Sequence, residues 1–121
     1  CYGNYGGQTV QKGNYEALLP KLLELEVNQF VLEFARRGYD ELVHFAKYDS
    51  RIEIGLGVID IKDLQIETPD GVAQRIETGA RIIGADRLAA VPDCGLWMLP
   101  RSVALGKLEN LVKGRDLFLG K

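Results

Sequence analysis

The stretch RIEIGLGVIDIK, residues 51–62, decides the fold that the sequence predicts. Branched apolar side chains alternate in it with glycines, which predicts a strand over roughly residues 52–60. One face of this strand would carry the large apolar side chains of Ile54, Leu56 and Val58. The other face would carry Gly55 and Gly57, which have no side chains. Glycines on a strand leave space for a ligand or for a close backbone approach.

A helix is predicted directly after this strand, within ETPDGVAQRIETGARIIGAD, residues 67–86. Thr68 can cap it, Pro69 suits the first helical position and Gly84 can end it. The apolar positions recur at helical spacing and predict a buried stripe of Val72, Ala73, Ile76, Ala80 and Ile83.

The same alternation extends in both directions. VNQFVLEFA, residues 27–35, predicts a strand with Phe30, Leu32 and Phe34 on one face and Val31, Glu33 and Ala35 on the other. LAAVPDCG, residues 88–95, predicts another strand, which Pro92 would end because it lacks an amide donor.

Helices are predicted around these strands. The first would begin near Leu18, with Pro20 in its first turn. A second is marked by Tyr39, Leu42, Val43 and Ala46, and the last by Val103, Ala104, Leu108, Leu111 and Val112, with Gly114 after it. The glycine-rich residues 1–13 are predicted to form a loop.

Strands that alternate with helices predict an α/β fold with parallel strands and right-handed crossovers. Either a small open sheet or the later half of an eight-fold (TIM) barrel fits, and periodicity does not choose between them. Function gathers at the carboxyl ends of the strands in both architectures. Glu33, the region Asp60 to Lys62 and Cys94 lie there, and Cys1 would follow a strand ending just upstream.

Composition narrows the possible functions. The 121 residues fit one domain, and a net charge of −2 with a pI near 5.4 argues against a nucleic-acid partner. No apolar run approaches the roughly 20 residues that cross a bilayer. Because Met98 is the only methionine and the chain starts at Cys1, we expect it to be part of a longer protein whose upstream half is missing here.

The chemistry-bearing residues leave alternatives open. Two cysteines permit inert thiols, metal ligands or a disulfide. Nothing indicates an oxidising compartment, so we reject the disulfide and expect a cytoplasmic protein. Several of these residues also have structural interpretations. Glu33 could pair with an Arg or Lys, Asp93 could cap the following turn, and Glu67 could pair with Arg75. Lys62 could be solvated in a loop and His44 lie at the surface, while Trp97 and Met98 could line a pocket or pack under a loop.

Several motifs together resemble the cobalamin-independent methionine synthase family. They are CYGN at residues 1–4, the glutamate strand FVLEFA, GLGVID before the helix with Arg75, PDCG around Cys94, and the pair Lys107 and Leu108. The resemblance covers essentially the whole chain and is closer to the short, single-barrel relatives. It implies the C-terminal half of a TIM barrel, spanning residues 1–121.

The resemblance implies a zinc-dependent methyltransferase that moves a methyl group from methyltetrahydrofolate to homocysteine. Cys1, Glu33 and Cys94 match three zinc ligands of the family, and the family's histidine ligand would stand two positions before Cys1. Lys62 stands where the long enzymes have a catalytic histidine. A zinc enzyme acting on another thiol, like the epoxyalkane:coenzyme M transferases, and a non-catalytic α/β subunit are the alternatives. The missing half or self-association would cover the exposed barrel edge.

Overall fold

Helices and strands alternate along the chain in a computed structural model that describes residues 14–47 and 52–121. The elements are α1 (Tyr15–Leu22), β1 (Gln29–Leu32), α2 (Leu42–Ala46), β2 (Glu53–Ile59), α3 (Pro69–Ile83), the 3₁₀ turn η2 (Ala85–Arg87), β3 (Leu88–Pro92) and α4 (Arg101–Phe118). The predicted loop over residues 1–13 lies outside the described residues.

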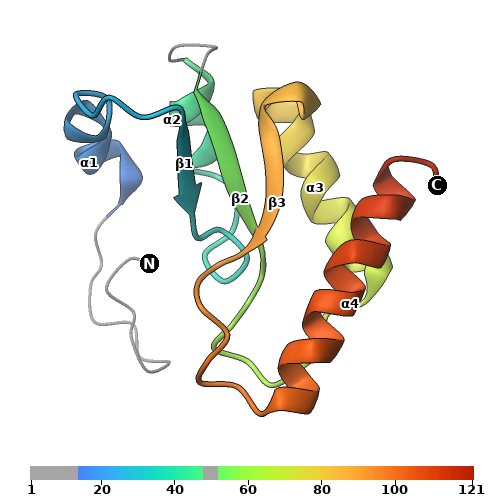
Figure 1. Cartoon of the computed structure of the whole chain (residues 1–121). Coiled ribbons are helices and arrows are strands. Elements are labelled where there is room, and N and C mark those ends of the chain that lie inside the picture. Colours follow the sequence, from blue (N-terminus) through green and yellow to red (C-terminus); the bar gives the residue numbers. More distant parts are fainter. Residues whose placement is uncertain (1–13, 48–51) are drawn as a thin grey trace.

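The three strands form one parallel sheet in the order β1-β2-β3 (Figure 1). Phe30 is in register with Ile54, and Leu56 with Ala90. All three carboxyl ends therefore lie at the same edge of the sheet, the lower edge in Figure 1. This confirms the predicted α/β fold with parallel strands.

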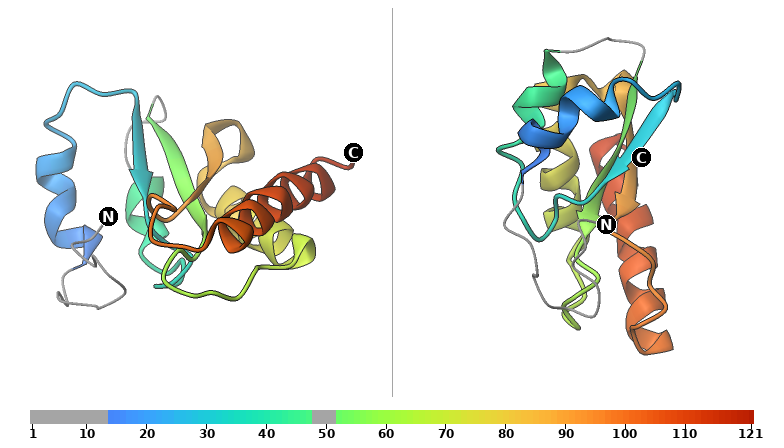
Figure 2. Two further views of the ribbon diagram at one scale, coloured as in Figure 1. Left: turned by 60° about the horizontal axis from the view of Figure 1, so that its bottom comes forward. Right: turned by 90° about the vertical axis from the view of Figure 1, so that its left-hand side faces the viewer.

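Helices α2 and α3 lie on one face of the sheet, and α4 lies beside β3 (Figures 1 and 2). Helix α3 contacts both α2 and α4, so the helices follow one another around the sheet in chain order. A doubly wound open sheet reverses its strand order and carries helices on both faces. The consecutive order seen here is instead that of a barrel segment.

The core lies between the sheet and the helices on that face. Ile54, Leu56 and Val58 are at most 1% exposed, as the alternation in β2 predicts. Three rings pack beside them in tilted or edge-to-face contacts, those of Tyr15 from α1, Phe45 from α2 and Phe34 just after β1. This packing places the loop after β1 firmly against the helical layer.

Helix α3 forms as predicted because its signals are local. The Thr68 hydroxyl accepts a hydrogen bond from the Gly71 N–H, Pro69 opens the helix and Gly84, with a φ of 99°, ends it. Its buried residues are Val72, Ile76, Gly79 and Ile83, while Ala73 and Ala80 are half-buried.

Helix α1 begins earlier than predicted, at Tyr15 rather than near Leu18. The Asn14 side chain accepts a hydrogen bond from the Ala17 N–H and so caps the helix there. Pro20 consequently lies inside the helix, where it removes one backbone donor, and the helix ends at Leu22.

Helix α2 forms where it was predicted, but not all of the residues that marked it are buried. Leu42 and Phe45 are the buried residues of this short helix, whereas Val43 is 43% exposed and Ala46 is also exposed. The phenyl ring of Phe45 reaches the rings of Tyr15 and Phe34, so tertiary packing rather than local spacing selects the buried face.

Gly114 does not end the last helix, which continues to Phe118. A Cβ atom at this position would lie 2.5 Å from the Val72 Cβ and 2.7 Å from the Pro69 carbonyl oxygen. Gly114 therefore lets the backbones of α3 and α4 approach closely where the two helices cross.

Candidate functional site

Polar residues gather at the carboxyl ends of all three strands. Glu33 directly follows β1, the turn from Asp60 to Lys62 follows β2, and Asp93 and Cys94 follow β3. Neighbouring parallel strands end side by side, so these residues share one edge of the sheet. Cys1, the remaining predicted ligand, lies outside the described residues.

Glu33 is fully buried and its carboxylate faces a lysine. The Lys62 Nζ lies 3.5 Å from the Glu33 Oε2, and the two side chains are 2% and 0% exposed. The reading of Lys62 as a solvated loop lysine was therefore wrong. Its Nζ is buried and has no hydrogen-bond partner among the described residues.

The backbone of Glu33 is held by Tyr15. The Tyr15 hydroxyl accepts a hydrogen bond of 3.0 Å from the Glu33 N–H and donates one of 3.1 Å to the Glu33 carbonyl oxygen. Because Tyr15 is itself 4% exposed and packed against the rings of Phe34 and Phe45, it fixes where the Glu33 side chain begins.

Asp93 joins the loops after β3 and β1. Its Oδ1 accepts hydrogen bonds of 2.9 Å from the N–H groups of Phe34 and Ala35, and its Oδ2 accepts one of 3.1 Å from Arg36. The residue is 5% exposed, so it does not simply cap the turn that follows it. Burial raises the pKa of its carboxyl, the three backbone bonds oppose this, and the nearby Glu33 charge adds to it.

The predicted space over the glycines of β2 is filled by protein groups. A Cβ atom on Gly57 would lie 2.0 Å from the Asp93 Oδ1, and one on Gly55 would lie 2.9 Å from the Val31 Cγ2. Gly57 thus makes room for the Asp93 carboxylate to cross β2, which is a close approach that only glycine permits.

A second group of charges, of which only Arg75 is substantially exposed, supports the turn after β2. The Glu67 carboxylate lies 3.6 Å from the Arg75 guanidinium, which confirms the predicted pair, and 2.9 Å from the Nζ of Lys107. Its Oε1 also accepts a hydrogen bond of 2.8 Å from the Asp60 N–H. Lys107 is 0% exposed, so α4 is tied through Glu67 to the end of β2.

The turn itself is closed by Asp60. Its Oδ1 accepts a hydrogen bond of 2.8 Å from the Lys62 N–H, and its Oδ2 lies 3.1 Å from the Arg36 Nη1. Lys62 is thereby held over the end of β2 with its side chain directed to Glu33.

Cys94 is a free, half-buried thiol two residues beyond β3. Within residues 14–47 and 52–121, no three His, Cys, Asp or Glu side chains are grouped as a metal site. The described edge therefore offers Glu33 and Cys94 as donors of the predicted set.

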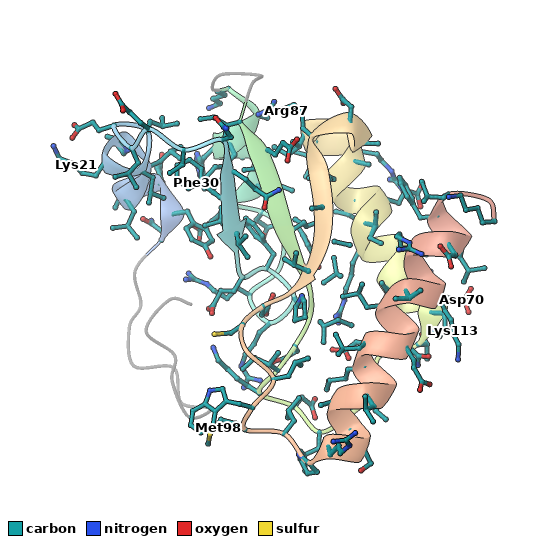
Figure 3. All side chains as sticks on the ribbon, in the orientation of Figure 1. Lys21, Phe30, Asp70, Arg87, Met98 and Lys113 are labelled. Carbon is teal, nitrogen blue, oxygen red and sulfur yellow. The ribbon has the colours of Figure 1, made fainter. Side chains whose placement is uncertain are left out.

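Other residues singled out in the sequence lie elsewhere. His44 is on α2, 3.9 Å from Glu16, which fits its reading as a residue away from the strand ends. Trp97 and Met98 are 67% and 53% exposed, so neither is packed under a loop. Figure 3 labels Met98 at the end of the molecule where the strands finish.

An apolar cavity lies apart from this polar edge. It has a volume of about 360 Å³ and lies between α3, β3 and α4, with Leu56, Leu88 and Phe118 in its wall.

The sequence did not predict two of the polar contacts that hold this edge together, those of Asp93 with the loop after β1 and of Lys107 with Glu67. The available signal was that both residues stand in or beside otherwise apolar runs.

Comparison with known proteins identifies relatives over most of the chain. Residues 11–115 match the family described as "Cobalamin-independent synthase, Catalytic domain". A "Methionine synthase" of Thermococcus kodakarensis is 37% identical over 111 residues, covering 92% of this chain and 33% of that protein. One of Sulfurisphaera tokodaii is 40% identical over 105 residues, covering 87% and 30%.

A solved structure agrees with these matches. The B12-independent methionine synthase from Shewanella sp. W3-18-1, in complex with selenomethionine, superposes with a TM-score of 0.76 at 26% identity. The match covers 88% of this chain and 30% of that one. The fold is thus the α/β arrangement of a TIM barrel, and the chain spans about a third of the length of the curated relatives. The described helices include none long and apolar enough to cross a membrane.

Proposed function

Because this chain belongs to the cobalamin-independent synthase catalytic-domain family, we propose that it forms part of a methionine synthase-like methyltransferase. In this proposal a methyl group passes from methyltetrahydrofolate to the thiol of homocysteine and gives methionine. The support is the family match over residues 11–115 and the named relatives at 37% and 40% identity. The chain would supply the C-terminal half of the barrel, and an upstream half would complete it.

Zinc is the proposed cofactor, with Cys1, Glu33 and Cys94 as its ligands. The observation that carries this is the fully buried Glu33 carboxylate at the same strand edge as the free Cys94 thiol. Thiolate and carboxylate are both donors that zinc accepts. Both described donors are of a type that zinc accepts, and both follow strand ends at the same edge of the sheet. Reduced thiols are needed for such a site, so the proposal includes a cytoplasmic location.

The metal, when bound, would lower the pKa of a substrate thiol and make its thiolate available near neutral pH. Glu33 is oriented for a ligand role through its backbone, which Tyr15 holds at both the N–H and the carbonyl. The thiolate attacks the methyl carbon, the carbon–nitrogen bond breaks, and the electron pair of that bond stays on the folate nitrogen. That nitrogen then needs a proton.

Lys62 is the proposed donor of that proton. Its ammonium is held beside Glu33 and has donor capacity that no described residue uses. A buried ammonium with free N–H groups at the strand edge can donate to a substrate atom placed there.

Metal content in three variants tests the proposal. We expect the purified wild-type protein to carry zinc, and Glu33→Gln and Cys94→Ser to lose most of it. Glu53→Gln is the matched control, because Glu53 is exposed at the opposite end of β2. Zinc is measured by elemental analysis without prior chelation, and methyl transfer by methionine formation. Full zinc content and activity in Glu33→Gln would overturn the ligand assignment, and turnover with coenzyme M instead of homocysteine would overturn the substrate.

A further inference from the structure

The Asp93 side chain forms several hydrogen bonds to a distant part of the chain. Its carboxylate accepts three backbone hydrogen bonds from consecutive residues, Phe34, Ala35 and Arg36. Phe34 is 59 residues away in the sequence, so this is a tie between distant segments of the chain. Charge-assisted bonds of this kind are about twice as strong as bonds between neutral groups.

The tie crosses the strand in the middle of the sheet. Strands β1 and β3 both pair with β2 and do not pair with each other. The Asp93 carboxylate passes over Gly57 of β2, where a Cβ atom would lie 2.0 Å from its Oδ1. The Asp93 N–H is in turn bonded to the Ile59 carbonyl oxygen at 2.9 Å. Asp93 is thus fixed to β2 through its backbone and to the loop after β1 through its side chain.

Both ends of this tie adjoin a proposed ligand. Glu33 directly precedes Phe34, and Cys94 directly follows Asp93. We propose that Asp93 is a positioning residue that sets the location of Glu33 relative to Cys94. This inference rests on the proposed function, because it concerns the two donors assigned there to zinc. Gly57 is also required for this positioning, because any larger residue there would displace the Asp93 carboxylate.

Asp93→Asn tests this inference with little change of shape. The amide keeps one oxygen acceptor and replaces the other with a donor that cannot accept from a backbone N–H. We expect zinc affinity to fall by about 10-fold to 100-fold, the range seen when partners that orient metal ligands are changed. The amides of residues 34–36 should also exchange hydrogen faster.

The control is Arg87→Gln. The Arg87 side chain also bonds to a distant segment, donating hydrogen bonds of 3.1 Å and 3.0 Å from its Nε and Nη2 to the carbonyl oxygen of Ile52, the residue before β2. It lies at the opposite end of the sheet from Met98, as Figure 3 shows. Its loss should weaken the sheet without changing the metal affinity.

A spectroscopic readout separates positioning from simple loss of stability. With Co²⁺ in place of zinc, the d–d absorption bands report the ligand geometry. They should shift in Asp93→Asn and in Gly57→Ala but not in Arg87→Gln. Unchanged zinc affinity and unchanged Co²⁺ bands in Asp93→Asn would overturn the positioning role of Asp93. If the wild-type protein bound zinc in the same experiment, the proposed function would still stand. A wild-type protein that binds no zinc would instead overturn the proposed function.

Discussion

Lys62 and Glu33 form a buried ion pair between two successive strand ends, with the Lys62 Nζ 3.5 Å from the Glu33 Oε2. The side chains are 2% and 0% exposed, so water does little to solvate either charge. Taking away one partner of such a pair leaves an uncompensated buried charge, which costs far more than the pair itself contributes.

We therefore expect Lys62→Met to lower the free energy of unfolding by about 3–5 kcal/mol. Adding Glu33→Gln to that variant should restore much of the loss, because the orphaned charge is then gone. Urea unfolding of the wild type, both single variants and the double variant measures the coupling. Lys21→Met is the control, since the Lys21–Glu24 pair is 79% and 64% exposed. Strictly additive effects of the two buried changes would contradict the expectation.

The Lys107–Glu67 and Arg81–Glu77 ion pairs have the same length but differ in burial, so comparing them isolates the effect of burial on stability. The Lys107 Nζ and the Glu67 Oε2 are 2.9 Å apart with side chains 0% and 10% exposed, whereas Arg81 and Glu77 are also 2.9 Å apart but 70% and 53% exposed. Lys107→Met should cost about 3–5 kcal/mol and Arg81→Met less than about 1 kcal/mol. Thermal and urea unfolding give both values, and equal losses would show that burial does not govern these pairs.

We expect Tyr39 to make the free energy of unfolding fall as the pH becomes alkaline. Its hydroxyl donates a hydrogen bond of 3.0 Å to the Gly57 carbonyl oxygen. Burial raises the pKa of this phenol, Arg75 opposes the shift, and Asp93 and Glu67 add to it. The folded state therefore keeps the proton at a pH where the unfolded chain has lost it. This contribution to stability is complete below the ordinary tyrosine pKa of about 10 and declines as the pH rises above it.

Between about pH 10 and about pH 11, the wild type should lose about 1 kcal/mol more unfolding free energy than Tyr39→Phe does, because about half of the unfolded-state phenol is still protonated at pH 10. Denaturant unfolding across this range measures the difference, and the other titrating groups cancel between the two proteins. Parallel pH profiles would refute the assignment.

Helix α4 presents an apolar stripe to solvent. Leu105, Leu108 and Val112 are 47%, 38% and 44% exposed and recur at helical spacing. We expect the 121-residue chain to self-associate through surfaces of this kind, because contiguous apolar patches are rarely left open in monomers. Changing all three residues to Gln should shift the sedimentation coefficient toward that of the monomer. Leu64→Gln, in an exposed loop, is the control, and a wild type that is monomeric at every concentration would refute the prediction.

Local signals determined much of the secondary structure. The strand predicted from the alternation in residues 51–62 is found as β2. Helix α3 is capped by Thr68, opens with Pro69 and ends at Gly84, as predicted. These features depend on neighbours a few residues away, so the sequence contains all the information they need. Alternating strands and helices also sufficed to predict parallel pairing, because the crossover rule leaves few other topologies.

Partners across the fold needed the tertiary structure. The sequence placed Glu33, Lys62 and Cys94 at one edge, since every parallel strand ends there, but it did not pair Lys62 with Glu33 or bring Asp93 to the amides after β1. Those contacts depend on how the loops run and on space such as that above Gly57. Gly114 likewise follows the predicted last helix in the sequence but lies inside α4, where it packs against Val72. Periodicity determines which face a side chain occupies, whereas only the packed chain determines what that side chain meets.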